Sequence, residues 1–306
     1  ARKIVSSLVQ KITYDDWLAE VFFQHDQSPP LSKYHNFSSY NPEIISNVAN
    51  VFATAAFRFG HTLINNKLYR LDSDLKPIKK YGHLDIHKSF FAPYHLHNYG
   101  GIDPVLRGLI FNAAKNNDAE DVDNAADGKY AGLITDELTE RLFKMNEKVS
   151  LDLAAINIQR GRDHALPFYK TWRKFCNLPS ETDQQILSDI PEIYHQKIRN
   201  VYQTPQNLEA FPGFILERKI SKNSKVGPTL ACLLKKQFEE LRDGDRFFFE
   251  KAHVFKMDQL RALKKISLAQ IICLTGDNID RVKANVFRID SEIVGCRDVL
   301  KDFDLS

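Results

Sequence analysis

The sequence predicts a mainly α-helical fold in a single domain. Apolar residues recur at the 3.6-residue spacing of helices through most of the 306 positions. No convincing run of alternating apolar and polar residues indicates a strand, and no internal repeat divides the chain. The composition, 43% hydrophobic and 26% charged, is ordinary for a folded globular protein.

The N-terminal 22 residues predict two helices. In the first, five apolar residues share one face: Ile4, Val5, Leu8, Val9 and Ile12. Thr13 and Asp16 have the spacing of a capping box, so a second helix is expected to begin there. Its apolar residues are Trp17, Leu18, Val21 and Phe22. Residues 27–42 are rich in Pro, Ser, Tyr and Asn and are expected to form a loop.

Residues 43–64 predict a third helix that is apolar nearly all round, and a helix without a polar face is expected to be buried. The acidic stretch 115–129 has almost no large apolar side chains, so it predicts an exposed insertion within one domain that spans residues 1–306. Further helices are expected near residues 103–112, 133–149, 150–160, 183–202, 226–242 and 256–264.

The net charge and the motifs that the sequence lacks argue against several classes of function. A net charge of +3 suggests neither a nucleic-acid partner nor an anionic membrane surface. No apolar run approaches the roughly 18 residues that span a bilayer. The sequence holds no P-loop, no G-x-S-x-G and no C-x-x-C motif. Its four cysteines allow three disulfide connectivities, and the sequon at Asn36 is compatible with a secreted glycoprotein.

The third helix carries the most informative residues. Arg58 and His61 lie three residues apart on one face, and burying both is costly unless each has a partner. Gly60, between them, removes a side chain where a flat group could approach. A bound haem would account for all three residues: its iron would bind the imidazole of His61, a propionate would pair with the guanidinium of Arg58, and the flat ring would lie over Gly60. A core histidine bonded to a backbone carbonyl accounts for the same spacing, and periodicity alone does not decide between them.

A second stripe, at residues 153–164, has helical spacing: Leu153, Asn157, Arg160 and His164. Asn157 lies in an otherwise apolar stretch, where its amide must find partners. A structural asparagine followed by a surface ion-pair network also explains this pattern. The pairs His83/His87 and His95/His97 have a spacing compatible with metal ligands. No carboxylate or thiol ligand accompanies them in the sequence, which argues against a dedicated metal site.

Taken together, these segments resemble the animal haem peroxidases, the superfamily of myeloperoxidase, thyroid peroxidase and peroxidasin. FRFGHTLI at 57–64 resembles the family's proximal-histidine segment, and NIQRGRDH at 157–164 resembles its most recognisable signature. Five further segments match in the family's order: ARKIV at 1–5, GGIDPVLRG at 100–108, VGP at 226–228, LRDGDRF at 241–247 and ISL at 266–268. Ala165 departs from the pattern, since the family usually has glycine there.

The resemblance implies a role for each matching residue. His61 would be the proximal axial ligand of a b-type haem iron, and Asn157 would accept the Nδ1–H of its imidazole. Arg58 would pair with a haem propionate and Arg160 would lie at the propionate edge. The haem pocket would be walled by Phe57, Phe91, Leu142, Phe143, Leu153 and Ile156. The family's disulfides would join Cys176 to Cys232 and Cys273 to Cys296.

The resemblance also implies that the chain is the proximal part of a larger domain. In the family, the distal histidine and arginine, the acidic residues that esterify haem and the calcium loop precede a segment like residues 1–5. The expected protein is therefore a secreted peroxidase that uses hydrogen peroxide to oxidise a halide, a phenol or a protein tyrosine. A non-catalytic extracellular module for adhesion or matrix assembly is the alternative, and a haem-free helical domain is a third hypothesis.

Overall fold

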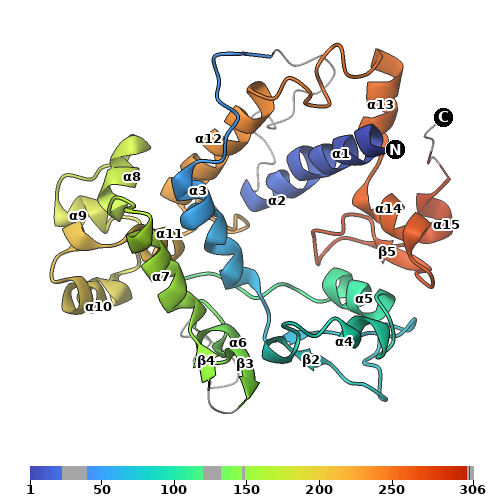
Figure 1. Cartoon of the computed structure of the whole chain (residues 1–306), viewed down its shortest axis with the longest axis horizontal. Helices are drawn as coiled ribbons and strands as arrows, with labels where there is room; N and C mark the ends of the chain where they lie inside the picture. The colour runs from blue at the N-terminus through green and yellow to red at the C-terminus, as the bar shows by residue number, and fades with distance from the viewer. Residues whose placement is uncertain (23–39, 120–131, 147–148, 302, 304–306) are drawn as a thin grey trace.

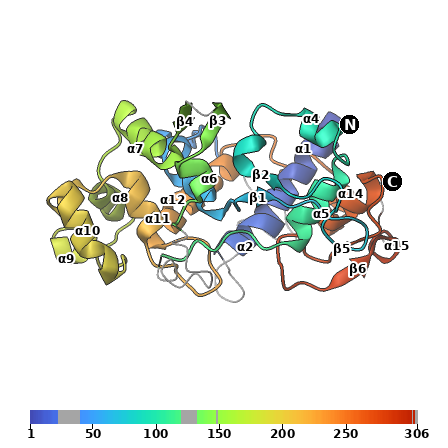
Figure 2. The same ribbon diagram turned by 90° about the horizontal axis from the view of Figure 1, so that it is seen from below.

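The computed structural model describes residues 1–22, 40–119, 132–146, 149–301 and 303, and it confirms a mainly helical fold (Figures 1 and 2). The first half contains α1 (Arg2–Lys11), the π-helical η1 (Ile12–Trp17), α2 (Leu18–Phe22), α3 (Asn50–Thr54), the 3-10 helix η2 (Ala56–Leu63), β1 (Lys67–Leu68), β2 (Leu84–Asp85), the 3-10 turn η3 (Ile86–Lys88), α4 (Tyr94–His97), α5 (Asp103–Phe111), α6 (Asp136–Thr139), β3 (Leu142–Asn146) and β4 (Val149–Leu151).

The second half is helical until a short antiparallel ribbon near its end. It contains α7 (Leu153–Asp163), α8 (Tyr169–Phe175), α9 (Asp183–Ile186), α10 (Glu192–Tyr202), the 3-10 turn η5 (Pro205–Asn207), α11 (Ala210–Leu216), α12 (Pro228–Asp243), α13 (Met257–Lys265), α14 (Leu268–Thr275), β5 (Arg281–Lys283), β6 (Ile293–Gly295) and α15 (Cys296–Val299). The described strands form three two-stranded antiparallel pairs, β1–β2, β3–β4 and β5–β6.

The helix start expected at Thr13 is wrong. The chain runs from α1 through η1 into α2 without a break, and Lys11 at the end of α1 pairs with Asp16 in η1 at 2.8 Å. Part of the apolar face of α1 lies outside the core, as the exposed fractions of Val5 and Val9, 59% and 60%, show.

The third helix is shorter than expected and changes type. It begins at Asn50, and Ile45, which was expected inside it, is 74% exposed. Ala49 ends the preceding segment, where its N–H donates to Gln237 Oε1 at 2.7 Å. After the kink at Ala55 the chain tightens into the 3-10 helix η2, so the segment is not a continuous α-helix over 43–64.

Two other predicted helices are divided. The helix expected over 133–149 is wrong beyond residue 139, because β3 and β4 form a hairpin in which Leu142 pairs with Leu151. The helix expected over 183–202 is interrupted between Ile186, where α9 ends, and Glu192, where α10 begins directly after Pro191. The helices expected near 103–112, 150–160, 226–242 and 256–264 correspond to α5, α7, α12 and α13.

Of the acidic stretch 115–129, the structure describes residues 115–119. Ala119 is 1% exposed, and Asp118 pairs with Lys219 at 3.4 Å, so the predicted exposure is wrong at this end of the stretch. Residues 120–129 lie outside the described residues, as does Asn36.

The main core forms around α12, whose Leu234 is fully buried. Leu18 from α2, Phe59 from η2 and Phe214 from α11 belong to the same cluster. A smaller cluster joins α5, α14 and the β5–β6 ribbon near the C-terminus. Among the described residues, no helix combines the length and apolar character needed to cross a bilayer.

Two disulfides close parts of the helical body, with the pairing that the resemblance implied. Cys176 bonds to Cys232, which links the end of α8 to α12, and Cys273 bonds to Cys296, which links α14 to α15. Their sequence separations are 56 and 23 residues, so the first closes the larger loop.

Candidate functional site

The geometry of η2 explains why Arg58 and His61 face the same way. A 3-10 helix has three residues per turn, so residues three apart lie one above the other. Ala56, Phe59 and Thr62 form the buried row, each at most 3% exposed. Arg58 and His61 form another row, and both stay half-buried at the surface of the core.

Helix α7 brings Asn157 to this row. Its first turn is capped by Asp152, whose Oδ1 accepts from Ala154 N and Ala155 N at 2.8 and 3.1 Å. α7 lies beside α3 and the start of η2 (Figure 1), and this places Asn157, which is 0% exposed, against both side chains. Asn157 Nδ2 lies 2.9 Å from His61 Nδ1, within the hydrogen-bonding distance expected from the sequence.

The direction of that hydrogen bond differs from the expectation. Arg58 Nη1 donates to Asn157 Oδ1 at 2.8 Å, and a guanidinium has only donors, so the amide oxygen must face Arg58. The amide nitrogen therefore faces His61 and donates to Nδ1, whereas Asn157 was expected to accept from that atom. In this arrangement the imidazole proton lies on Nε2.

Burial and positive charge govern the electrostatics of the site. Burial, with the Arg58 charge as a second cause, holds the pKa of His61 below its ordinary value, so the imidazole is neutral near pH 7. Burial and the Arg160 guanidinium also lower the pKa of Arg58. Arg160 is exposed and pairs with Asp163 at 3.6 Å. Two guanidinium groups on one face favour an anionic ligand, which would relieve their repulsion.

Two of the aromatic side chains that the resemblance assigns to the pocket are exposed to solvent. Phe57 is 43% exposed and stacks on Phe52 with ring centroids 4.7 Å apart, and Phe91 is 71% exposed. Phe143, Leu153 and Ile156 are half-buried. Leu142, in contrast, is only 2% exposed and belongs to the main core cluster, so its side chain is not on the open surface, where the resemblance put it.

This face fits a planar apolar group that carries carboxylates. A Cβ added at Gly60 would meet no atom within 4 Å, so the space beside η2 is open. Neutral imidazole is a good ligand for a transition metal, and exposed aromatic rings next to paired guanidinium groups match an apolar plane with an anionic edge. Arg58, His61 and Asn157, three of the residues that haem would need, are thus close to one another.

Among the described residues, His83, His87 and His164 have partners of their own, whereas His95 Nδ1 is buried without a hydrogen bond. His83 Nδ1 accepts from Arg70 N at 3.1 Å, and His87 contacts the Glu137 carboxylate. The described residues contain no group of three or more His, Cys, Asp or Glu arranged for a metal ion. His164 ends α7, where its Nδ1 lies 2.8 Å from Asn50 Oδ1. Sequence reasoning missed the His87–Glu137 contact, because fifty positions separate the two residues and no local pattern joins them.

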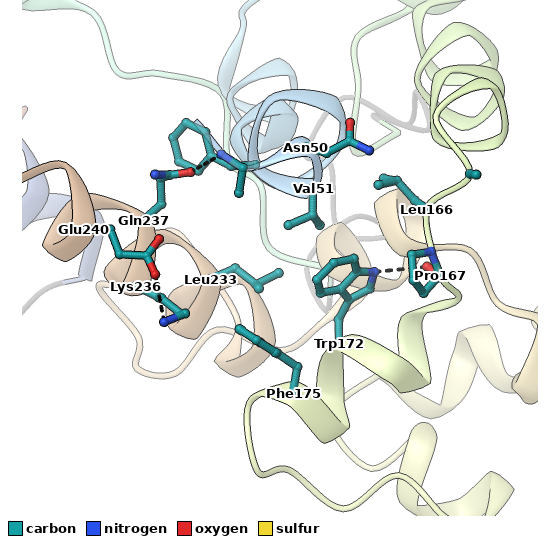
Figure 3. Close-up of a pocket in the computed structure, with 13 residues that line it drawn as sticks. Asn50, Val51, Leu166, Pro167, Trp172, Phe175, Leu233, Lys236, Gln237 and Glu240 are labelled. Carbon is teal, nitrogen blue, oxygen red and sulfur yellow. Dashed lines mark hydrogen bonds and ion pairs between the residues drawn. The ribbon is translucent and has the colours of Figure 1, made fainter. Parts of the chain in front are cut away.

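A separate cavity of about 390 Å³ lies between α3, α8 and α12 (Figure 3). Val51, Trp172 and Leu233 line it with apolar surface. Its polar edge is satisfied internally, since Trp172 Nε1 donates to Pro167 O at 3.0 Å and Lys236 pairs with Glu240 at 2.9 Å (Figure 3). The lining is therefore mainly an apolar contact surface, and the polar groups named above already bond to one another.

The comparison with protein families matches the model for animal haem peroxidase over residues 1–287. Peroxidasin homolog pxn-1 of Caenorhabditis elegans is 44% identical over 289 residues, which cover 94% of this chain and 21% of that protein. Human eosinophil peroxidase is 40% identical over 290 residues, which cover 94% of this chain and 38% of that protein. The chain therefore spans well under half the length of these relatives.

Among solved structures, peroxidase A from Dictyostelium discoideum has a similar fold, with a TM-score of 0.76 and 28% sequence identity. The match covers 94% of this chain and 50% of that one. The helical fold described above is therefore similar to half of a known peroxidase chain.

Proposed function

The chain belongs to the animal haem peroxidase family, and from this we propose that it carries the proximal part of a haem-dependent peroxidase. The proposed activity is the oxidation of halide, phenolic or protein-tyrosine substrates by hydrogen peroxide. The observation that carries the proposal is the contact of His61 with Asn157, which in turn binds Arg58.

In this proposal His61 Nε2 binds the haem iron, and Arg58 and Arg160 bind the propionates. Phe57, Phe91, Phe143, Leu153 and Ile156 contact the macrocycle, with Leu142 behind them. Haem, when bound, supplies the capacity to take oxidising equivalents from peroxide and pass them to a reducing substrate. The neutral imidazole of His61 suits this role, because a protonated ring could not bind a metal ion.

Iron binding requires a specific movement of the Asn157 amide. A metal on Nε2 needs the imidazole proton on Nδ1, and Asn157 must then present its oxygen to that proton. The oxygen is released when Arg58 exchanges it for another acceptor, such as a carboxylate. We propose that Arg58 would hold a haem propionate in this way, which would leave the Asn157 oxygen available to His61.

A neutral amide next to the iron ligand has a chemical consequence. A carboxylate in this position would pull the Nδ1 proton and make the imidazole more anionic, which stabilises ferric iron. The neutral amide of Asn157 would not add this negative charge to the imidazole. The haem potential is therefore expected to be higher, which suits the oxidation of poor electron donors.

Peroxide cleavage also requires a base and a positive charge on the opposite side of the haem. We propose that these distal residues, a calcium site and any covalent attachment of haem belong to a preceding segment that packs on this chain. The coverage of half of the Dictyostelium peroxidase chain supports this proposal. The two disulfides support a secreted location, because such bonds persist in oxidising compartments.

The test compares haem absorbance and guaiacol oxidation in the intact protein and in His61→Ala. The intact protein should show a ferric Soret band and peroxide-dependent turnover, and the variant should lose both. His195→Ala is the matched control, since His195 Nε2 contacts Ile190 O far from the site in α10. Full turnover in the 306-residue chain alone would contradict the assignment of distal residues elsewhere. A folded, haem-loaded but inactive parent would favour the non-catalytic extracellular module.

A further inference from the structure

One buried carboxylate connects two segments of the chain, η3 and the turn between α6 and β3. Glu137 in α6 has a side chain that is 8% exposed. Its Oε2 accepts from His87 N at 3.2 Å and contacts His87 Nδ1, and its Oε1 pairs with Arg141 Nη1 at 3.3 Å. A buried carboxylate is costly unless its oxygens are hydrogen-bonded, so these contacts are expected to fix the positions of both partners.

Each connected segment continues into a phenylalanine with an unusual backbone. Phe91 has a φ of 54° and Phe143 a φ of 55°, both in the left-handed region. A bulky residue there costs about 1–3 kcal/mol and persists only where the surrounding structure holds it. The two rings contact each other, with centroids 5.3 Å apart.

Glu137 binds the start of each of these segments. Arg141 O accepts from Lys144 N at 3.1 Å, which closes a turn around Leu142 and Phe143. His87 lies in η3, four residues before Phe91. Phe90 adds a second contact between the segments, because its ring meets that of Phe143 edge-on at 5.0 Å. The carboxylate therefore binds the backbone N–H of His87 and the guanidinium of Arg141, which precede Phe91 and Phe143 by four and two positions.

We propose that Glu137 is a positioning residue that holds Phe91 and Phe143 as an aromatic wall for the planar group bound at His61. The inference rests on the proposed function. Burial alone does not explain the orientation of Phe91, which leaves the ring 71% exposed. A strained backbone that presents an apolar ring to solvent is instead what a preformed ligand contact requires.

The test places 4-fluorophenylalanine at position 91 or 143 of the intact protein and records ¹⁹F NMR spectra without haem. Each probe should give one sharp resonance, and Phe91→Leu should shift the probe at 143 through the lost ring contact. In Glu137→Leu, both resonances should shift and broaden, and Phe91→Leu should no longer affect position 143. Unchanged spectra at both positions would overturn the proposal.

Two milder variants separate the contacts and keep the test decisive if Glu137→Leu does not fold. Arg141→Gln removes the ion pair and should shift the probe at 143 more than the probe at 91. His87→Leu removes the imidazole contact and should shift the probe at 91 more than the probe at 143. Equal effects of both variants at both positions would indicate general destabilisation and would overturn the positioning role.

Glu250→Leu is the matched control, because Glu250 is also a buried carboxylate and pairs with Lys264 in α13. It should lower stability without shifting either probe. A final arm adds haem: both fluorine resonances should shift in the native protein and shift less in Glu137→Leu. If no haem binds at all, the proposed function fails, whereas the haem-free spectra still decide whether Glu137 positions the two rings.

Discussion

Asn157 and His61 lie 96 positions apart in the sequence, yet Nδ2 of the amide is 2.9 Å from Nδ1 of the imidazole. Arg58 determines this orientation, because its guanidinium occupies the amide oxygen at 2.8 Å. The position of one proton on His61 therefore depends on a cation that does not contact the imidazole nitrogen directly. This dependence can be measured without haem.

Removal of the Arg58 guanidinium should change the tautomer of His61. In Arg58→Met the Asn157 oxygen is free to face the imidazole, and the proton should move from Nε2 to Nδ1 in a substantial fraction of molecules. The imidazole ¹⁵N resonances of haem-free protein report this directly. Arg162→Met, which removes the exposed pair with Glu209, should leave the tautomer unchanged. Identical ¹⁵N spectra for native protein and Arg58→Met would contradict the proposed coupling.

Asn157→Asp should keep haem but lower its midpoint potential. The added carboxylate takes up the Nδ1 proton and makes the iron ligand more anionic, which favours ferric iron. Turnover with guaiacol should fall by about 10-fold, in the range seen when such hydrogen-bond partners of metal ligands are changed. Redox titration followed by absorbance measures the potential, with the exposed Asn200→Asp as control. A potential at or above the native value would refute this account.

Ala165→Gly should stabilise the protein. Ala165 follows α7 with a φ of 50°, a conformation that glycine adopts without steric cost. The expected gain is about 0.5–1 kcal/mol in the free energy of unfolding, after the larger entropy of glycine in the unfolded chain is subtracted. Ala262→Gly, within α13, should instead destabilise by up to about 1 kcal/mol. Urea denaturation distinguishes the two, and a loss of stability in both would show that the φ value carries no strain.

Glu217 should make stability depend on pH. Burial raises the pKa of Glu217 to about 7, above its ordinary value of 4.5, although Thr229 N and Tyr169 Oη donate to it. Because the folded state favours the neutral acid, this contribution to stability is complete below about pH 4.5 and is lost as the pH rises through about 7.

Glu217→Gln keeps the shape of the side chain and removes the titration. Melting temperatures measured from pH 4.5 to 8 should therefore fall less steeply with pH in the variant than in the native protein. Glu181→Gln, at an exposed pair with Lys174, should retain the native slope. If the native and Glu217→Gln profiles were parallel, Glu217 would not be the responsible group.

Periodicity predicted the long helices α7 and α12, and α12 buries one apolar face. In α7 the buried residue is Asn157, and Leu153 and Ile156 are half-buried. The hairpin at 142–151 could not be predicted this way. Leu142 and Phe143 have spacing compatible with a helix, and a turn with Phe143 in the left-handed region depends on Arg141 being held by Glu137. Glu137 in turn contacts His87, fifty positions away, and no local pattern relates these two residues.

The candidate site was partly accessible from the sequence. The pairing of His61 with Asn157 came from the resemblance, and the structure places the two within hydrogen-bonding distance. The direction of that bond was not accessible, because it depends on which acceptor Arg58 finds in three dimensions. The glycine that the family usually has at position 165 was an indirect signal of the positive φ found there.

The disulfide between Cys176 and Cys232 makes the segment from α8 to the start of α12 a covalent ring. Lys222 and Asn223 lie in an exposed turn inside that ring, between α11 and α12. Trypsin cleavage after Lys222 would therefore open the ring without releasing either piece. The nicked protein would migrate as one band on a non-reducing gel and as two bands after reduction, because the disulfide would be the covalent link between the piece with α7 and the piece with α12.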